Sequence, residues 1–111
     1  MEPAFSYAGN MDVFTKTVSR PDQAGAEAAG LRWLAQAHGD VVVDVAEVTP
    51  TSISTRRVEQ SRPSALAARA FGAALRTVHE AGAPAFGAPP AGWGGANFIG
   101  RVGKRCEPCE S

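Results

Sequence analysis

Lys16 and Glu27 are the residues of this sequence whose types and spacing could act together on one ligand. Lys16 lies in a stretch of alternating residues typical of a strand, and Glu27 follows in a stretch typical of a helix. A lysine ammonium can contact phosphate oxygens, and an opposed carboxylate keeps that ammonium oriented in a partly dry cleft. The pattern predicts a phosphate-contacting pair, with two solvated surface charges as the alternative interpretation.

Two elements must position this pair. Residues 5–18 alternate around the turn signal Gly9-Asn10, so we expect a tight hairpin with Lys16 on its second strand. Residues 22–37 predict a helix with Glu27 within or beside its apolar stripe. The residues three and four positions from Glu27 include no cation, so its partner is expected on another element.

The rest of the chain predicts further short elements. Residues 41–48 are rich in β-branched side chains and predict a strand, and residues 53–59 predict its antiparallel partner, either an edge strand or a poorly ordered segment. Residues 63–82 predict an amphipathic helix. Residues 82–100 are rich in glycine and proline and predict an irregular loop, and the tail at residues 101–111 is expected to be mobile.

Together these elements predict an α+β fold with a small antiparallel sheet and two main helices. Their order, with a strand lysine followed by a helix glutamate, is that of a protein-kinase-like N-terminal lobe, and we expect the C-terminal lobe to be absent. We divide the chain into a partial nucleotide-binding lobe at residues 1–60, a crossover helix after the hinge at residues 61–82, and a loop and tail at residues 83–111.

Length and charge exclude several classes of function. A chain of 111 residues forms one domain at most. Its formal net charge is zero and its arginines are scattered, so it has no electrostatic footprint for nucleic acid or for an anionic membrane. No segment approaches the roughly 20 apolar residues that cross a bilayer. We therefore expect a cytoplasmic protein without a nucleic-acid or membrane partner.

The two cysteines, Cys106 and Cys109, form a C-x-x-C motif near the end of the chain. A structural zinc ion needs four ligands, and His38 and His79 lie far away in sequence. We interpret the motif as two tail thiols without a function. A metal-linked or redox role remains the alternative.

The sequence resembles actinobacterial-type proteins of the fructosamine kinase (ketosamine-3-kinase) family in three segments: VFTK at Val13 to Lys16, EAAGLRWLA at Glu27 to Ala35, and AFGAALRTVHEAGAPAFGAPPAGW at Ala70 to Trp93. The last segment is long and specific, and the resemblance covers roughly residues 4–100. The family has the aminoglycoside-phosphotransferase and protein-kinase-like fold. It phosphorylates ketoamine sugars on glycated amines.

The resemblance implies roles for three residues. Lys16 matches the phosphate-binding lysine, Glu27 matches its helix partner, and Glu59 falls near the hinge at which the adenine base would lie. It also implies ATP and magnesium as cofactors, and a nucleotide and a glycated amine as binding partners.

The sequence departs from the family pattern at both ends. Gly9 is the one glycine before Lys16, where the family has a glycine-rich phosphate loop. The family's catalytic aspartate, in a His-Gly-Asp motif, and its metal-binding aspartate lie well downstream and have no match here. His38-Gly39-Asp40 has the same letters, but we interpret it as a helix cap followed by a strand. We assign no catalytic residue and no metal ligand.

Three hypotheses follow. In the first, the chain is a truncated fructosamine-kinase-like protein that is inactive alone, because the resemblance stops after Gly100. In the second, it is a non-enzymatic interaction module that self-associates or binds a partner through the second helix and the loop at residues 86–99. The third is the metal-linked or redox role of Cys106 and Cys109.

Overall fold

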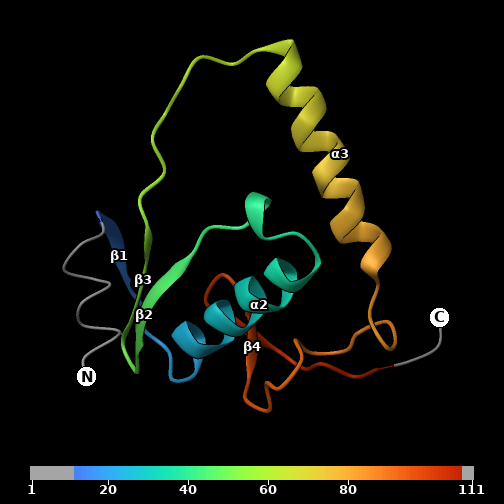
Figure 1. Ribbon diagram of the computed structural model, residues 1–111. Helices are drawn as coiled ribbons and strands as arrows, with labels where there is room; N and C mark the ends of the chain where they lie inside the picture. Colours follow the sequence, from blue (N-terminus) through green and yellow to red (C-terminus); the bar gives the residue numbers. More distant parts are fainter. Residues whose placement is uncertain (1–11, 109–111) are drawn as a thin grey trace.

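A computed structural model describes residues 12–108 of the chain. The strands and helices are, in order, β1 (Val13–Thr17), α2 (Gln23–Ala37), the 3-10 helix η1 (Gly39–Val41), β2 (Val45–Thr49), β3 (Ser52–Arg56), α3 (Ala65–Ala81), β4 (Asn97–Ile99) and β5 (Val102–Lys104). Figure 1 shows α2 beside the sheet and α3 at the end of an extended connection. The predicted turn at Gly9-Asn10 and the strand before it lie outside the described residues.

The first three strands form one antiparallel sheet in the order β1-β3-β2. Lys16 of β1 lies opposite Ile53 of β3, which in turn lies opposite Val48 of β2. The prediction that this third strand lies at an edge or is poorly ordered was wrong, because β3 is the central strand. Its polar residues are satisfied between strands: the hydroxyl of buried Ser54 is 2.8 Å from that of Thr15.

Strand β2 begins later than the strand that the sequence predicts for residues 41–48. Five of the eight residues at 41–48 are valine, but β2 begins only at Val45. The chain first forms one 3-10 turn, in which the Val42 N–H donates to the Gly39 carbonyl at 3.3 Å. The predicted helix cap at His38 is present, and a turn rather than a strand follows it.

Helix α2 covers the sheet and supplies much of a small core. Ala24 and Ala28, four residues apart on one face, are buried against Ile53, which is 2% exposed. Partly buried apolar residues surround these three: Val18, Leu31, Val45 and Val48. The core is mostly alanine, so each helix residue contributes little buried area, and Ile53 is the largest fully buried side chain among the described residues.

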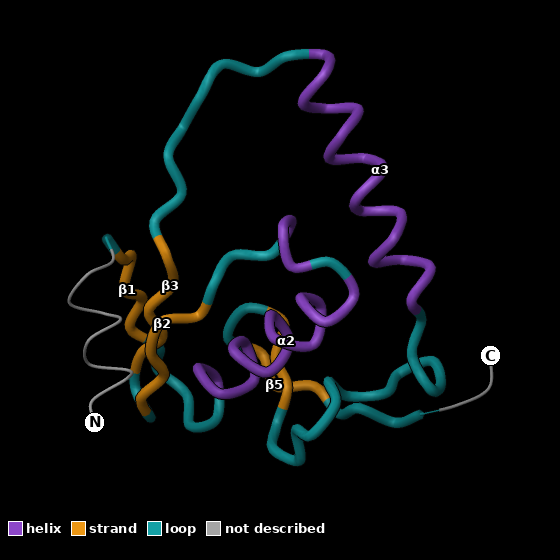
Figure 2. Tube along the Cα trace, viewed as in Figure 1, coloured by secondary structure: helices purple, strands orange, loops and turns teal. Residues whose placement is uncertain are grey.

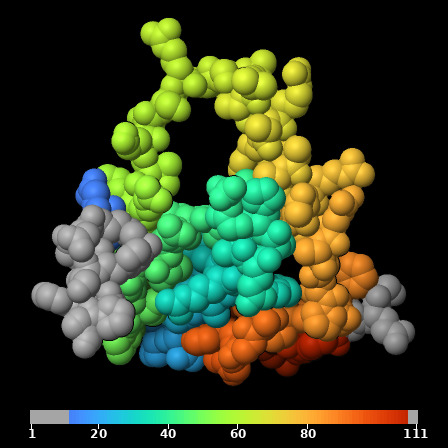
Figure 3. Space-filling view, in the orientation of Figure 1, coloured from blue at the N-terminus to red at the C-terminus, as the bar shows by residue number. Residues whose placement is uncertain are grey.

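Helix α3 is well formed but packs weakly. Ser64 is its N-cap, with the hydroxyl accepting a hydrogen bond from the Ala67 N–H at 3.0 Å. Residues 57–64 connect it to β3 as an exposed, extended segment, and none of the helix residues is buried. Figure 3 shows an opening between this connection, α3 and the body of the molecule.

The last two strands form a second antiparallel sheet, in which Phe98 pairs with Gly103. The sequence predicted an irregular loop up to Gly100 and a tail without regular structure, and for residues 97–104 this was wrong. Gly100 permits the turn, because its φ of 59° lies in the left-handed region that favours glycine. Strand β4 of this hairpin contacts α2 (Figure 2).

The described residues therefore form a small α+β fold with two main helices and antiparallel sheets, as predicted. Within residues 12–108, no helix is both long enough and apolar enough to cross a membrane.

Candidate functional site

The structure brings Lys16 and Glu27 together. The ammonium Nζ of Lys16 is 2.6 Å from Oε1 of Glu27. Lys16 is the cross-strand partner of Ile53, so it lies on the sheet face that α2 covers. Glu27 directly precedes buried Ala28 on α2. The carboxylate of Glu27 therefore lies at the edge of the interface between α2 and the sheet. The two charges thus meet where the core opens to solvent.

The Lys16–Glu27 pair is partly exposed to solvent, which limits its contribution to folding stability. The side chains of Lys16 and Glu27 are 47% and 36% exposed. An ion pair so accessible to water contributes about 0–1 kcal/mol to folding stability. The pair therefore adds little to the stability of the fold. A short ion pair that is partly exposed can instead present an oriented ammonium to an anion.

A hollow of about 260 Å³ lies beside the pair. Lys16 and three residues of α2 line one side, and three residues of the last hairpin line the other: Gln23, Ala26 and Glu27 face Asn97, Phe98 and Gly100. The hairpin that the sequence did not predict is therefore a wall of the candidate site.

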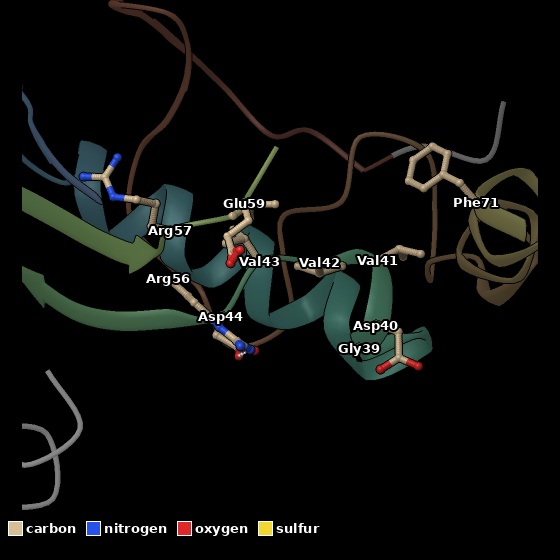
Figure 4. Close-up of a pocket in the computed structure, with 11 residues that line it drawn as sticks. Gly39, Asp40, Val41, Val42, Val43, Asp44, Arg56, Arg57, Glu59 and Phe71 are labelled. Atoms are coloured by element: carbon tan, nitrogen blue, oxygen red, sulfur yellow. Dashed lines mark ion pairs between the residues drawn. The ribbon is translucent and has the colours of Figure 1, made fainter. Parts of the chain in front are cut away.

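Glu59, the third predicted site residue, lies elsewhere. It is exposed in the connection after β3 and lines a larger hollow of about 760 Å³ with Phe71 of α3. Figure 4 shows Glu59 near the ends of β2 and β3, together with Arg56 and Asp44, whose charged atoms are 3.8 Å apart. The described structure does not bring Glu59 to Lys16 and Glu27.

Residues 12–108 form no candidate metal site. No group of three histidine, cysteine, aspartate or glutamate side chains there could surround an ion. Magnesium in kinases is bound by one or two carboxylates and by substrate phosphates. The carboxylate nearest Lys16 is Glu27, which pairs with that lysine. The described residues therefore do not fit a magnesium site by themselves.

The other motifs with possible chemistry form no site. Asp40 and His38 lie around the 3-10 turn, away from Lys16. The amide Nδ2 of Asn97 is 3.5 Å from Sγ of Cys106, a weak contact, and the second cysteine of the motif, Cys109, lies outside the described residues. Neither motif adds a catalytic group to the hollow beside Glu27.

Trp93 packs against α2 at Gly25, a partner that sequence reasoning did not name. The indole lies so close to Gly25 that a Cβ there would be 2.6 Å from Cη2 of the ring. The available signal was a glycine within a helical pattern, which often marks the close approach of another segment. Gly25 could have been read in that way.

One solved structure resembles the chain closely. It is described as a "putative fructosamine-3-kinase" from Thermobifida fusca YX-ER1, and it superposes with a TM-score of 0.78 at 30% sequence identity. The match covers 93% of this chain. It confirms the resemblance to the fructosamine kinase family. The described fold is accordingly part of a kinase-like fold.

The match covers only 36% of the Thermobifida protein. This chain therefore spans about a third of the length of its structural relative. No protein-family model matches the sequence, and no curated protein does.

Proposed function

We propose that this chain is the nucleotide-facing part of a fructosamine-kinase-like fold, and that Lys16 contacts the phosphates of ATP. The observation that carries the proposal is the 2.6 Å pairing of Lys16 with Glu27, in a chain similar to such a kinase over 93% of its length. The pair also has the order of elements that a kinase lobe uses, with the lysine on a strand and the glutamate on the following helix.

Lys16 acts by charge in this proposal. Its ammonium donates to phosphate oxygens and offsets their negative charge. Glu27 accepts a hydrogen bond from the same ammonium, and so restricts the rotation of a long side chain that would otherwise sample many positions. The half-exposed geometry leaves other donor positions of the ammonium open to a ligand.

The proposal assigns the N-terminal lobe to residues 1–60, the crossover helix to residues 61–82, and the loop and tail to residues 83–111. Glu59 lies where the connection leaves β3, and we propose that this part of the chain borders the adenine base. Glu59 and the Lys16 pair line two different hollows, and the proposal places the base at the first and the phosphates at the second.

Phosphoryl transfer is not proposed for this chain alone. Transfer requires a group that orients the attacking hydroxyl and metal ions that neutralise the phosphates. Residues 12–108 assemble no such set of carboxylates beside Lys16. We propose that the chain binds a nucleotide, and that phosphorylation of a glycated amine requires further residues acting together with it.

Calorimetric titration with ATP and with ADP, each with magnesium, tests the proposal. Wild-type protein should bind both, and Lys16→Met should weaken binding by roughly tenfold or more, because a charge-assisted contact to phosphate is lost. Lys104→Met is the matched control, since Lys104 is the other lysine of the chain and lies outside the hollow. Absence of binding to wild-type protein, or equal losses in both variants, would contradict the proposal.

A second candidate function is self-association through α3. The observation that favours it is the exposure of large apolar side chains on and after this helix: Leu66 at 75%, Phe71 at 53% and Phe86 at 67%. A second copy of the chain could cover this face. Light scattering after gel filtration should then show a dimer that Phe71→Ser dissociates, whereas a monomer at every concentration would exclude it.

A further inference from the structure

The segment at residues 93–104, which we call the C-terminal strap, contacts the first turn of α2 and the residues just before it. Its contacts are polar and specific. Nη1 of Arg20 donates to the Arg101 carbonyl at 2.9 Å, and Nε2 of Gln23 donates to the Gly100 carbonyl at 3.2 Å. The Arg20 guanidinium also lies 5.7 Å from the centroid of the Phe98 ring. Residues about 80 positions apart in sequence are thereby joined.

Trp93 anchors this strap because it fits between two positions that lack a side chain. A Cβ on Gly25 of α2 would be 2.6 Å from the indole Cη2, and a Cβ on Gly95 would be 2.6 Å from Cζ2. The indole N–H donates to the Ala96 carbonyl at 2.9 Å, which fixes the ring in its plane. A methyl group on Gly25 would therefore clash with the ring in its present position.

The N-cap residue of α2 also contacts the strap. Asp22, the N-cap of α2, has a φ of 70°, a conformation that few side chains adopt, and its carboxylate makes no hydrogen bond to the helix it caps. Oδ2 of Asp22 instead accepts from the Ala96 N–H at 3.4 Å. A group that normally stabilises its own helix is thus directed to the strap.

One of the residues that contact the strap, Gln23, lies one helical turn from the glutamate of the ion pair. Gln23 and Glu27 are four residues apart and share a face of α2. Both line the hollow beside Lys16, and the strap supplies the opposite wall with Phe98 and Gly100. A rotation or shift of the first turn of α2 would therefore displace the Glu27 carboxylate relative to the strand that carries Lys16.

We propose that the C-terminal strap positions α2 so that Glu27 meets Lys16, with Trp93 against Gly25 as the decisive contact and Arg20 as its support. Trp93, Gly25 and Arg20 are positioning residues and touch neither charge of the pair. Any effect of this positioning on ligand binding rests on the proposed nucleotide site. The positioning of Glu27 by the strap does not depend on that site.

Lysine side-chain NMR tests the proposal without a nucleotide. With lysine labelled by nitrogen-15, the chain has two side-chain ammonium signals, from Lys16 and from exposed Lys104. Glu27→Gln defines how the Lys16 signal changes when the pair is broken. Gly25→Ala should shift the Lys16 signal toward that value, and Gly25→Ala combined with Trp93→Phe should return it, because the smaller ring leaves space for the methyl group.

A matched control separates this contact from a general effect of alanine in a helix. Gly72 of α3 has no atom within 4 Å of the position where a Cβ would lie, so Gly72→Ala makes the same chemical change without a clash. It should leave the Lys16 signal in place. If Gly25→Ala prevents folding, Arg20→Met gives a milder test, since it removes an exposed side chain together with its contacts to Arg101 and Phe98.

The proposal is overturned if the Lys16 signal stays unchanged in folded Gly25→Ala, or in folded Arg20→Met where that variant is used. It is also overturned if Gly72→Ala moves the signal equally, or if Trp93→Phe fails to reverse the effect of Gly25→Ala. Calorimetry on the same variants separates failure of the proposed nucleotide binding from failure of the proposed positioning. Wild-type protein that binds no nucleotide would contradict the proposed function and leave the NMR result to decide the positioning.

Discussion

The two main helices of this protein are similar in length and differ in how they are stabilised. Helix α2, with 15 residues, contacts the sheet through buried alanines and contacts the C-terminal strap through Gly25. Helix α3, with 17 residues, has a capped N-terminus and an amphipathic sequence, but none of its residues is buried. One helix depends on tertiary packing, and the other depends on local interactions.

This difference separates the candidate site from the rest of the fold. Lys16 and Glu27 lie at the interface of α2 with the sheet, where both partners are fixed by long-range contacts. Glu59 and Phe71 line the hollow next to α3, where the chain is exposed along the whole connection. We therefore expect substitutions around α2 to affect folding and the ion pair, and substitutions around α3 to act locally.

The largest expected effect comes from the core. Ile53→Ala removes the largest fully buried side chain and should lower the free energy of unfolding by about 2–5 kcal/mol. Leu66→Ala on α3, a residue that is 75% exposed, should change it by about 0.5 kcal/mol or less. Urea denaturation measures both. Equal losses would mean that α3 packs in solution and that the two helices do not differ.

The same glycine-to-alanine change should have opposite signs in the two helices. Gly72→Ala should stabilise the protein by about 0.5–1 kcal/mol, because alanine has less backbone freedom to lose. Gly25→Ala should destabilise it by about 1–3 kcal/mol, because the methyl group meets the Trp93 ring. Thermal unfolding compares them directly. Stabilisation by both variants would show that Trp93 does not constrain α2.

Loss of the α3 cap should appear locally. Ser64→Ala removes the hydroxyl that accepts from the Ala67 N–H and should cost about 1 kcal/mol of helix stability. Because α3 packs weakly, we expect faster hydrogen exchange of its amides while the amides of α2 keep their protection. Faster exchange in both helices would contradict independent behaviour.

The smallest effect is expected at the ion pair on the surface of α3. Arg76 and Glu80 are four residues apart with charged atoms at 2.8 Å. Glu80→Gln should lower helix stability by about 0.2–0.5 kcal/mol, and added salt should reduce the difference. Circular dichroism at low and high ionic strength measures this change. An effect that is independent of salt would indicate a contact other than a solvated ion pair.

Features set by local sequence could be predicted. Both helices were found because composition and spacing over 15 or more residues indicate them. The pairing of Lys16 with Glu27 was expected from the order of a strand lysine and a helix glutamate, and from the lack of a cation three or four positions from Glu27. The role of this pair in nucleotide binding stays a prediction.

Features set by long-range pairing could not be predicted in the same way. The position of β3 at the centre of the sheet depends on partners 39 residues apart, such as Thr15 and Ser54, and its polar composition suggested an edge. Strands β4 and β5 have three residues each, too few for a periodic pattern. Contacts made by Trp93 and Arg20 join the strap that contains these strands to α2.

The most direct test of the central claim is affinity labelling with an adenosine derivative that carries a sulfonyl fluoride at its 5′ position. The chain has two lysines, so peptide mapping compares Lys16 with Lys104 in one experiment. We predict that Lys16 is modified, that ADP protects it, and that Lys104 reacts slowly with no effect of ADP. Equal modification of both lysines without protection by ADP would contradict the assignment of Lys16 to a nucleotide site.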